Sequence, residues 1–227
     1  MIYGNGNDIY SLSGRPISLA DYNPLNLPPF TIRLLLLDNA IPTWQKGTFT
    51  QVSSSPNIWD CTYENPSWYS LLNSNGHVHI LLEVLGANTT GVTSMEDMFQ
   101  FNYLLTNVAW FDTTSVTSTS RMFYECNRLK RVPLFDTRNV RNMFQMFKSC
   151  LALENVPLFN TKSAVHMDDM FIDCYKVQSG ALALYQQAST QATPPTYHSG
   201  CFSRCGRDTT TGAAELLQIP SSWGGKA

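Results

Sequence analysis

The chain has 227 residues and a formal net charge of −2, so no overall charge draws it toward nucleic acid or an anionic membrane. Hydrophobic residues make up 43% of the chain, which is ample for a folded core, whereas charged residues reach only 14%, below the usual quarter. The longest aliphatic run, Leu34 to Leu37, is far too short to cross a bilayer. We therefore expect a neutral polar surface, no nucleic-acid binding and no membrane insertion.

Residues 1–29 are polar and rich in Pro and Asn, and they predict an extended N-terminal arm, either a docking segment or a disordered leader. Residues 1–14 contain no Lys or Arg, and polar residues interrupt their apolar positions, so the pattern of a signal peptide is missing. Two interpretations follow. A leader was removed before Met1, or the protein reaches its destination without one, as a cytosolic protein or a phage virion component released by lysis does.

Residues 30–79 are predicted to form a β-rich N-terminal cap. The runs FTIRLLLL, GTFTQVS and NIWDCTY read as strands of an antiparallel layer over the first repeat. His77 and His79 share one face of a further strand-like stretch with Glu83, and a metal site needs such convergence. Alternation along a cap strand explains the pattern as well, so we predict no metal.

Residues 80–180 repeat with a period of 24 residues. A Met-Phe pair, a Phe-Asp/Asn-Thr triplet and a Cys column all keep this register. A fixed period in this range is typical of stacked repeats, whose apolar columns form a shared core. The predicted structural core residues are Met98, Phe99, Met122, Phe123, Met146, Phe147, Met170 and Phe171, with Cys126, Cys150 and Cys174.

The unit LKRVPLFDTRNVRNMFQMFKSC illustrates the expected local structure. Val132 and Leu134 look like a short strand, and the following Phe-Asp-Thr turns the chain, which gives Asp112 and Asp136 a structural role. The V-x-x-M-x-x-M-F spacing is that of one helix face. We therefore predict an α/β repeat solenoid, leucine-rich-repeat-like, with parallel β-strands, short helices, the β-rich N-terminal cap and a C-terminal helical cap.

Residues 181–227 are predicted to hold a degenerate last repeat and the C-terminal cap. Cys201-Phe-Ser-Arg-Cys205 repeats the Met-Phe-x-x-Cys pattern after one period and an insertion of seven residues. The insertion predicts an enlarged helix around Ala181–Ala188. The segment 209–227 predicts a closing helix that is broken by Pro220, with Trp223 over the last repeat.

The cysteines raise the questions of disulfides and zinc. Free thiols are expected in the repeat column, because packing explains it, while a bridge between Cys201 and Cys205, or one involving Cys61, stays open. His198, Cys201 and Cys205 are zinc-type ligands without an evident fourth. Since both cysteines fall on repeat columns, core packing is the stronger account.

The stretch from Arg121 to Lys148 holds the one marked cluster of basic residues in the sequence. It suits a polyanion such as an acidic glycan, although a solvated repeat face explains it more simply. The sequence shows no nucleophile elbow, phosphate-binding loop, zincin helix or kinase signature, so we predict neither an enzyme nor a cofactor. The candidate binding residues are Arg128, Lys130, Arg131, Arg138 and Arg141.

The string VPLFDTRNVRNMFQMFKSC resembles the BspA-like leucine-rich repeats of Bacteroidales and other host-associated bacteria, whose units are similar to LFDTSNVTNMSYMFYNC. The likeness holds over three consecutive units, about residues 80–178. The ending TTTGAAELLQIPSSW also resembles that of related proteins from gut Bacteroidales and their phages. The resemblance implies a non-catalytic surface protein used for adhesion or protein interaction.

Because the repeats are few and no leader is evident, a phage virion accessory component is the first functional expectation: a head or tail fibre or decoration protein. A bacterial cell-surface adhesin is the second, and a metal-dependent glycan hydrolase that uses the His77/His79 face is a distant third. The first predicts location in the virion, contacts to other virion proteins through the N-terminal arm, homo-oligomers, and a host-surface protein or glycan as ligand.

Overall fold

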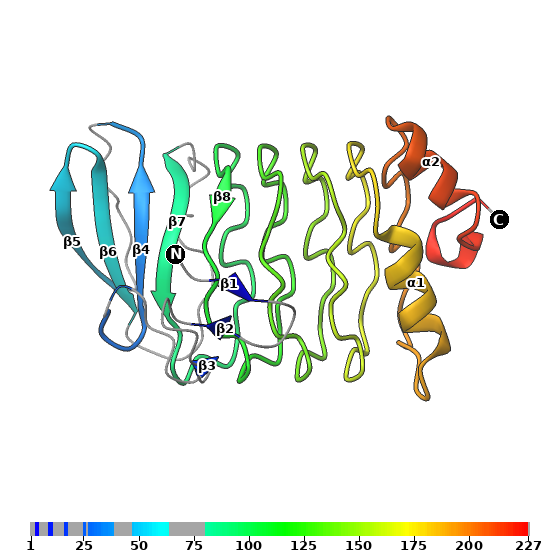
Figure 1. The fold of residues 1–227 in the computed structure, drawn as a ribbon, viewed down its shortest axis with the longest axis horizontal. Helices are drawn as coiled ribbons and strands as arrows, with labels where there is room; N and C mark the ends of the chain where they lie inside the picture. Colours follow the sequence, from blue (N-terminus) through cyan, green and yellow to red (C-terminus); the bar gives the residue numbers. More distant parts are fainter. Residues whose placement is uncertain are drawn as a thin grey trace.

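The computed structural model describes residues 3–4, 9–10, 16–17, 25, 27–38, 47–63 and 80–226. Figure 1 shows a sheet at one end of an elongated molecule, a row of similar loops in the middle and two helices at the other end. Most of the predicted arm lies outside the described residues. Within it, three two-residue strands form a small antiparallel sheet: β1 (Tyr3–Gly4), β2 (Ile9–Tyr10) and β3 (Pro16–Ile17).

A mixed five-stranded sheet has the strand order β5-β6-β4-β7-β8. All neighbours are antiparallel except β7 and β8, which pair in parallel. The strands expected at the three runs between residues 30 and 63 are confirmed as β4, β5 and β6. The bounds are β4 (Thr31–Leu36), β5 (Gly47–Ser54), β6 (Asn57–Tyr63), β7 (Leu81–Asn88) and β8 (Asn107–Val108).

Strand β4 shows how alternation builds this sheet. Ile32, Leu34 and Leu36 are fully buried in the core, as every second side chain of a half-covered strand should be. Between them Arg33 points away and meets Asp60, its partner in the β4–β6 register. Two hydrogen bonds of 2.7 and 2.8 Å join this pair, so cross-strand side chains reinforce the backbone ladder.

The prediction of an α/β repeat solenoid with leucine-rich-repeat units is wrong. The described chain forms a mixed five-stranded sheet, and its two α-helices both follow residue 180. Between residues 89 and 178, all of which are described, β8 is the only strand and no helix occurs. The strand expected at Val132–Leu134 is missing, and Pro133 and the equivalent Pro157 supply a reason, since neither can donate a ladder hydrogen bond. The β-rich N-terminal cap and the helical C-terminal cap belonged to this prediction and are withdrawn with it.

Hydrogen bonds between neighbouring 24-residue units replace the predicted helices. The amide of the Phe in each Met-Phe pair donates to a carbonyl of the next unit. These bonds are Phe99 N to Met122 O at 2.8 Å, Phe123 N to Met146 O at 2.9 Å, Phe147 N to Met170 O at 2.9 Å, and Phe171 N to Cys201 O at 2.8 Å. Amides at alternate positions bond three residues back, as Asn102 N does to Phe99 O at 3.2 Å. Each Met-Phe segment is therefore a series of turns.

Left-handed residues explain why these turns do not join into a helix. Two columns of non-glycine residues have φ between 52° and 65°: Asp97, Arg121, Gln145 and Asp169 in one, and Phe101, Glu125, Ser149 and Asp173 in the other. An α-helix needs negative φ throughout. Consecutive turns nevertheless bury residues three apart, so their apolar spacing imitates that of a helix.

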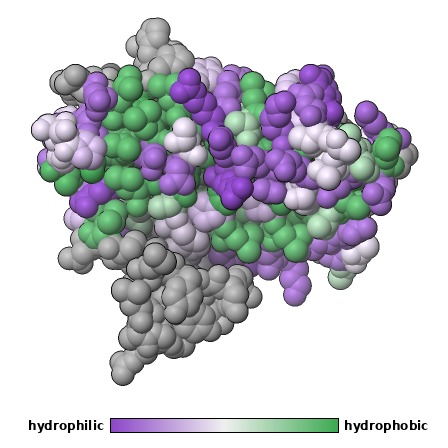
Figure 2. Space-filling model, turned by 45° about the horizontal axis from the view of Figure 1, so that its top comes forward, coloured by the Kyte–Doolittle hydropathy of each residue, from purple (hydrophilic) through white to green (hydrophobic). Residues whose placement is uncertain are grey.

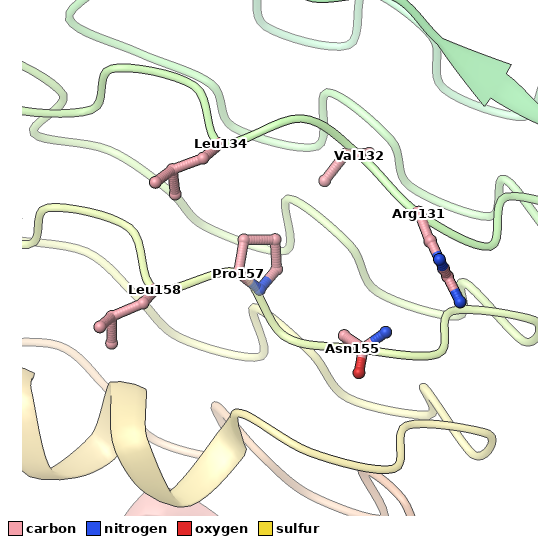
Figure 3. A pocket seen from close by; sticks show the side chains of 6 residues that line it. All are labelled: Arg131, Val132, Leu134, Asn155, Pro157 and Leu158. Atoms are coloured by element: carbon pink, nitrogen blue, oxygen red, sulfur yellow. The ribbon is translucent and has the colours of Figure 1, made fainter. Parts of the chain in front are cut away.

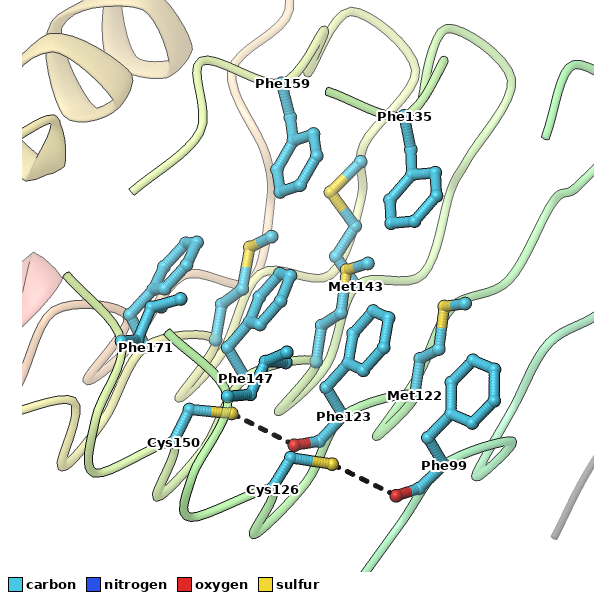
Figure 4. Packing of buried hydrophobic residues seen from close by; sticks show 14 of the residues in the cluster. Phe99, Met122, Phe123, Cys126, Phe135, Met143, Phe147, Cys150, Phe159 and Phe171 are labelled. Carbon is cyan, nitrogen blue, oxygen red and sulfur yellow. Dashed lines mark hydrogen bonds between the residues drawn. The ribbon is translucent and has the colours of Figure 1, made fainter. Parts of the chain in front are cut away.

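The core between the units is a row of stacked phenylalanines (Figure 4). Ring centroids lie 5.3 Å apart for Phe99–Phe123, 5.3 Å for Phe123–Phe147 and 5.2 Å for Phe147–Phe171. Phe202 of the last unit continues the row at 5.9 Å from Phe171. The residues assigned to the core from the sequence are all fully buried: Met98, Phe99, Met122, Phe123, Cys126, Met146, Phe147, Cys150, Met170, Phe171 and Cys174.

The cysteine column hydrogen-bonds to the backbone of the preceding unit. The thiol of Cys126 donates to Phe99 O at 3.1 Å, and that of Cys150 donates to Phe123 O at 3.1 Å (Figure 4). Burial raises the pKa of both thiols. All six cysteines of the chain are free and buried, so the repeat column holds protonated thiols that act as small hydrogen-bond donors.

The Phe-Asp-Thr triplets make the turns for which they were assigned. The Oδ1 atom of Asp112 accepts a hydrogen bond from Thr114 N at 2.8 Å, and that of Asp136 accepts one from Arg138 N at 3.1 Å. The following threonine reaches across to the next unit, as Thr137 Oγ1 does to Asn160 O at 2.8 Å. Local turn chemistry and contact between units thus come from adjacent side chains.

The C-terminal part contains α1 (Ala181–Thr190), α2 (Thr210–Leu216) and a 3₁₀ helix, η2 (Ser221–Trp223). Helix α1 lies where the insertion predicted a helix. Trp223 packs on the last unit, as expected, with its ring 6.4 Å from Phe202 and stacked 4.1 Å from His198. These contacts end the phenylalanine row.

Candidate binding groove

An open groove crosses two neighbouring units (Figure 3). Its volume is about 280 Å³, and its lining comes from equivalent segments of the two units: Arg131, Val132 and Leu134 from one, and Asn155, Pro157 and Leu158 from the other. Figure 3 shows the two leucines at one end of the groove and Arg131 with Asn155 at the other. The groove therefore has an apolar end and a polar end.

The apolar end is formed by side chains that the fold leaves uncovered. Leu134 is 44% exposed and Leu158 is 51% exposed. Phe135 and Phe159, the residues that follow them, are buried in the core. In both units the Phe side chain enters the core and the leucine before it stays in solvent.

The polar end of the groove carries the positive charge of Arg131, whose ion pair with Glu154 is exposed to solvent. Arg131 pairs with Glu154 at 2.9 Å, and the Arg131 side chain is 75% exposed against 27% for Glu154. Asn155 accepts a hydrogen bond from Ser179 Oγ at 2.8 Å. Exposed ion pairs contribute little stability, so Arg131 can turn to a carboxylate of a ligand at small cost.

The basic residues selected from the sequence are all exposed, but they do not all line the groove. Arg131 belongs to the segment that lines the groove, whereas Arg128 and Lys130 precede that segment and Arg138 and Arg141 follow it. Arg138 pairs with Asp136 at 2.7 Å. Among the residues that the structure describes, Arg128, Lys130 and Arg141 form no ion pair. Of the five, only Arg131 lines the groove.

Sequence reasoning missed Leu134 and Leu158 as candidate site residues. The signal was present: the two leucines occupy one column of the repeat and stand directly before a Phe of a core column. In each of the two units only one residue of such a pair is buried. Figure 2 shows that hydrophobic and hydrophilic residues are interspersed over one face of the molecule, so composition alone does not reveal the groove.

The residues considered for metal binding fall into two groups. His77 and His79 lie outside the described residues, so the face they were predicted to share with Glu83 is untested. His198 stacks on Trp223, and Cys201 and Cys205 are buried. No group of three or more His, Cys, Asp or Glu side chains in the described ranges is arranged to hold a metal ion. No helix in these ranges is long and apolar enough to span a membrane.

Residues 75–185 match the sequence pattern of a family described as "Mycoplasma protein of unknown function, DUF285". The matched range contains the 24-residue repeats and ends within α1. This match is consistent with the BspA-like repeat family that the sequence resembles. Comparisons with curated proteins and with solved structures gave no match.

Proposed function

We propose that this protein is a non-catalytic attachment module that binds a partner protein through the groove. The occupant is an extended segment of the partner that carries an apolar side chain beside a carboxylate. The observation that carries the proposal is the exposure of Leu134 and Leu158 in a groove that ends at Arg131.

Three physical features support this occupant. The leucines lie at equivalent positions of adjacent units, which gives an extended segment two apolar contacts in a row. The exposed guanidinium of Arg131 supplies a planar donor group that suits a carboxylate. The two sides of the groove belong to neighbouring units joined by backbone hydrogen bonds, among them Glu154 N to Lys130 O at 3.0 Å. A site held in this way loses little conformational freedom on binding.

A phage virion is the first location that we propose for this module, as an accessory component such as a head or tail fibre or decoration protein. The surface of a bacterial cell, as a BspA-like adhesin, is the second. The adhesin follows from the resemblance of the repeats to BspA-like surface proteins. The virion component follows from the small number of repeats and from the resemblance of the ending to proteins of gut Bacteroidales and their phages. Mass spectrometry of purified phage particles and of host envelope fractions separates the two: recovery in particles supports the virion component, and recovery in envelopes alone supports the adhesin.

The groove itself is tested by binding of purified variants to particles or envelopes from which the native protein has been removed. Burying a leucine side chain contributes about 1.5–3 kcal/mol, so we expect Leu134→Ser with Leu158→Ser to weaken binding more than tenfold. Leu151→Ser with Leu217→Ser is the matched control, because both leucines are exposed, at 38% and 61%, and lie outside the groove. Equal binding by the two double variants would show that the groove is not the attachment site.

A further inference from the structure

A single aromatic side chain stands out on the surface of the described residues. Tyr197 is 50% exposed, whereas every other large hydrophobic side chain of comparable exposure in the described ranges is aliphatic. Tyr175 and Tyr185 are both more covered. Tyr175 lies under the guanidinium of Arg207 at 3.9 Å, and Tyr185 meets Trp223 edge-on at 5.5 Å.

Two backbone hydrogen bonds fix the position of Tyr197, and one stacking contact orients its ring. Its amide donates to Val165 O at 2.9 Å, and its carbonyl accepts from Met167 N at 2.7 Å. The ring lies flat on the imidazole of His166, with centroids 4.4 Å apart and an angle of 2° between the planes. An aromatic surface fixed in this way costs little entropy when a ligand packs on it.

The imidazole that stacks on the ring lies close to a carboxylate. His166 Nδ1 lies 3.7 Å from Asp168 Oδ2, and both side chains remain partly exposed, at 43% and 24%. Asn142 forms a parallel bridge with His166, which in turn bridges to Tyr197. Ser199 is exposed two residues beyond Tyr197. The exposed ring thus has an imidazole stacked on one face and a carboxylate beside that imidazole, and an exposed serine follows two residues along the chain.

We propose that Tyr197, His166 and Asp168 form a binding platform for a neutral pyranose glycan. The C–H groups on one face of a sugar ring carry partial positive charge and pack on the negative face of an aromatic ring. Sugar hydroxyls donate to carboxylates and exchange hydrogen bonds with imidazoles and amides. A phosphate backbone would need several neutralising cations, yet the acidic residues Asp168 and Asp169 follow His166 within three positions of the chain.

This platform goes beyond the proposed function, because none of its residues lines the groove. A groove that holds a partner protein and a platform that holds a glycan would let one small chain link the two. The platform does not depend on the groove, and each can fail without the other.

The test is titration calorimetry of the full chain with a panel of defined neutral oligosaccharides built from glucose, galactose, mannose, xylose and N-acetylglucosamine. We expect at least one to bind with a dissociation constant in the millimolar range or tighter. We expect Tyr197→Ala to weaken that binding about tenfold or more, the loss typical of removing one aromatic stacking partner, and Tyr197→Trp to retain it.

Two controls make the result decisive. Tyr175→Ala should bind the sugar like the unaltered protein, because Arg207 already covers that ring. The groove variant with Leu134→Ser and Leu158→Ser should also bind the sugar normally, which separates failure of the platform from failure of the groove. Absence of binding across the whole panel overturns the proposal, and so does equal affinity of Tyr197→Ala and the unaltered protein.

Discussion

The sheet formed by β4 to β7 and the units that follow it solve the same structural problem in different ways. In the sheet, alternate side chains enter the core and backbone pairing joins neighbouring strands, with two register shifts between β4 and β7. In the units, backbone bonds between neighbours alternate with turns closed three residues back, and left-handed residues such as Gln145 and Ser149 recur between them. The sheet therefore depends on strand propensity, whereas the units depend on identical side chains meeting at a fixed spacing.

The largest expected effect comes from breaking the phenylalanine row. Phe147 stacks between Phe123 and Phe171, at 5.3 and 5.2 Å. Phe147→Ala should lower the free energy of unfolding by about 3–5 kcal/mol, because it removes a fully buried ring and leaves a cavity. Urea denaturation followed by circular dichroism measures this loss.

Phe144→Ala is the matched control for Phe147→Ala. Phe144 lies in the same unit but is only partly buried, so its removal should cost clearly less. If both substitutions cost the same, the stacked row is not what holds neighbouring units together.

The sequence predicted the sheet strands and the core columns well, but it misassigned the structure within each unit. Alternation in FTIRLLLL has one simple interpretation, and β4 follows it. The V-x-x-M-x-x-M-F spacing has two, since a helix and a series of turns both bury residues three apart. Positive φ at residues such as Gln145 and Ser149 selects turns over a helix. Neither glutamine nor serine predicts positive φ from the sequence.

The groove was less predictable for a related reason. Charge patterning selected five basic residues, and only Arg131 reaches the groove. Its leucines stand beside core phenylalanines in the sequence, where they read as part of the core. Only the local backbone conformation, which leaves Leu134 exposed and Phe135 buried, separates the binding surface from the core.

A smaller loss of stability should follow when one hydrogen bond between neighbouring units is removed. Thr137→Val keeps the shape of the side chain but removes the hydrogen bond from Thr137 Oγ1 to Asn160 O. We expect a loss of about 0.5–1.5 kcal/mol in the free energy of unfolding, because the substitution removes one hydrogen bond between neighbouring units. Thermal and urea unfolding both report this change.

The same substitution in the sheet should behave differently. Thr50 is exposed on β5, and valine suits an extended strand at least as well as threonine. Thr50→Val should therefore change stability by less than about 0.5 kcal/mol. A similar loss at both positions would mean that the threonine column is not a specific link between units.

The smallest predicted change in stability comes from replacing serine by glycine, and its sign should differ between the units and the sheet. Ser149 has a φ of 60°, and a left-handed conformation costs a non-glycine residue about 1–2 kcal/mol. Glycine removes this cost but adds about 0.5–1 kcal/mol of chain entropy, so Ser149→Gly should stabilise the protein by about 0.5–1 kcal/mol.

Ser53→Gly, in the extended β5, gains nothing from relief of strain and should destabilise the protein by about 0.5–1 kcal/mol. Melting temperatures that shift upward for Ser149→Gly and downward for Ser53→Gly would show that left-handed positions separate the units from the sheet. Two downward shifts would mean that the turns hold Ser149 without strain.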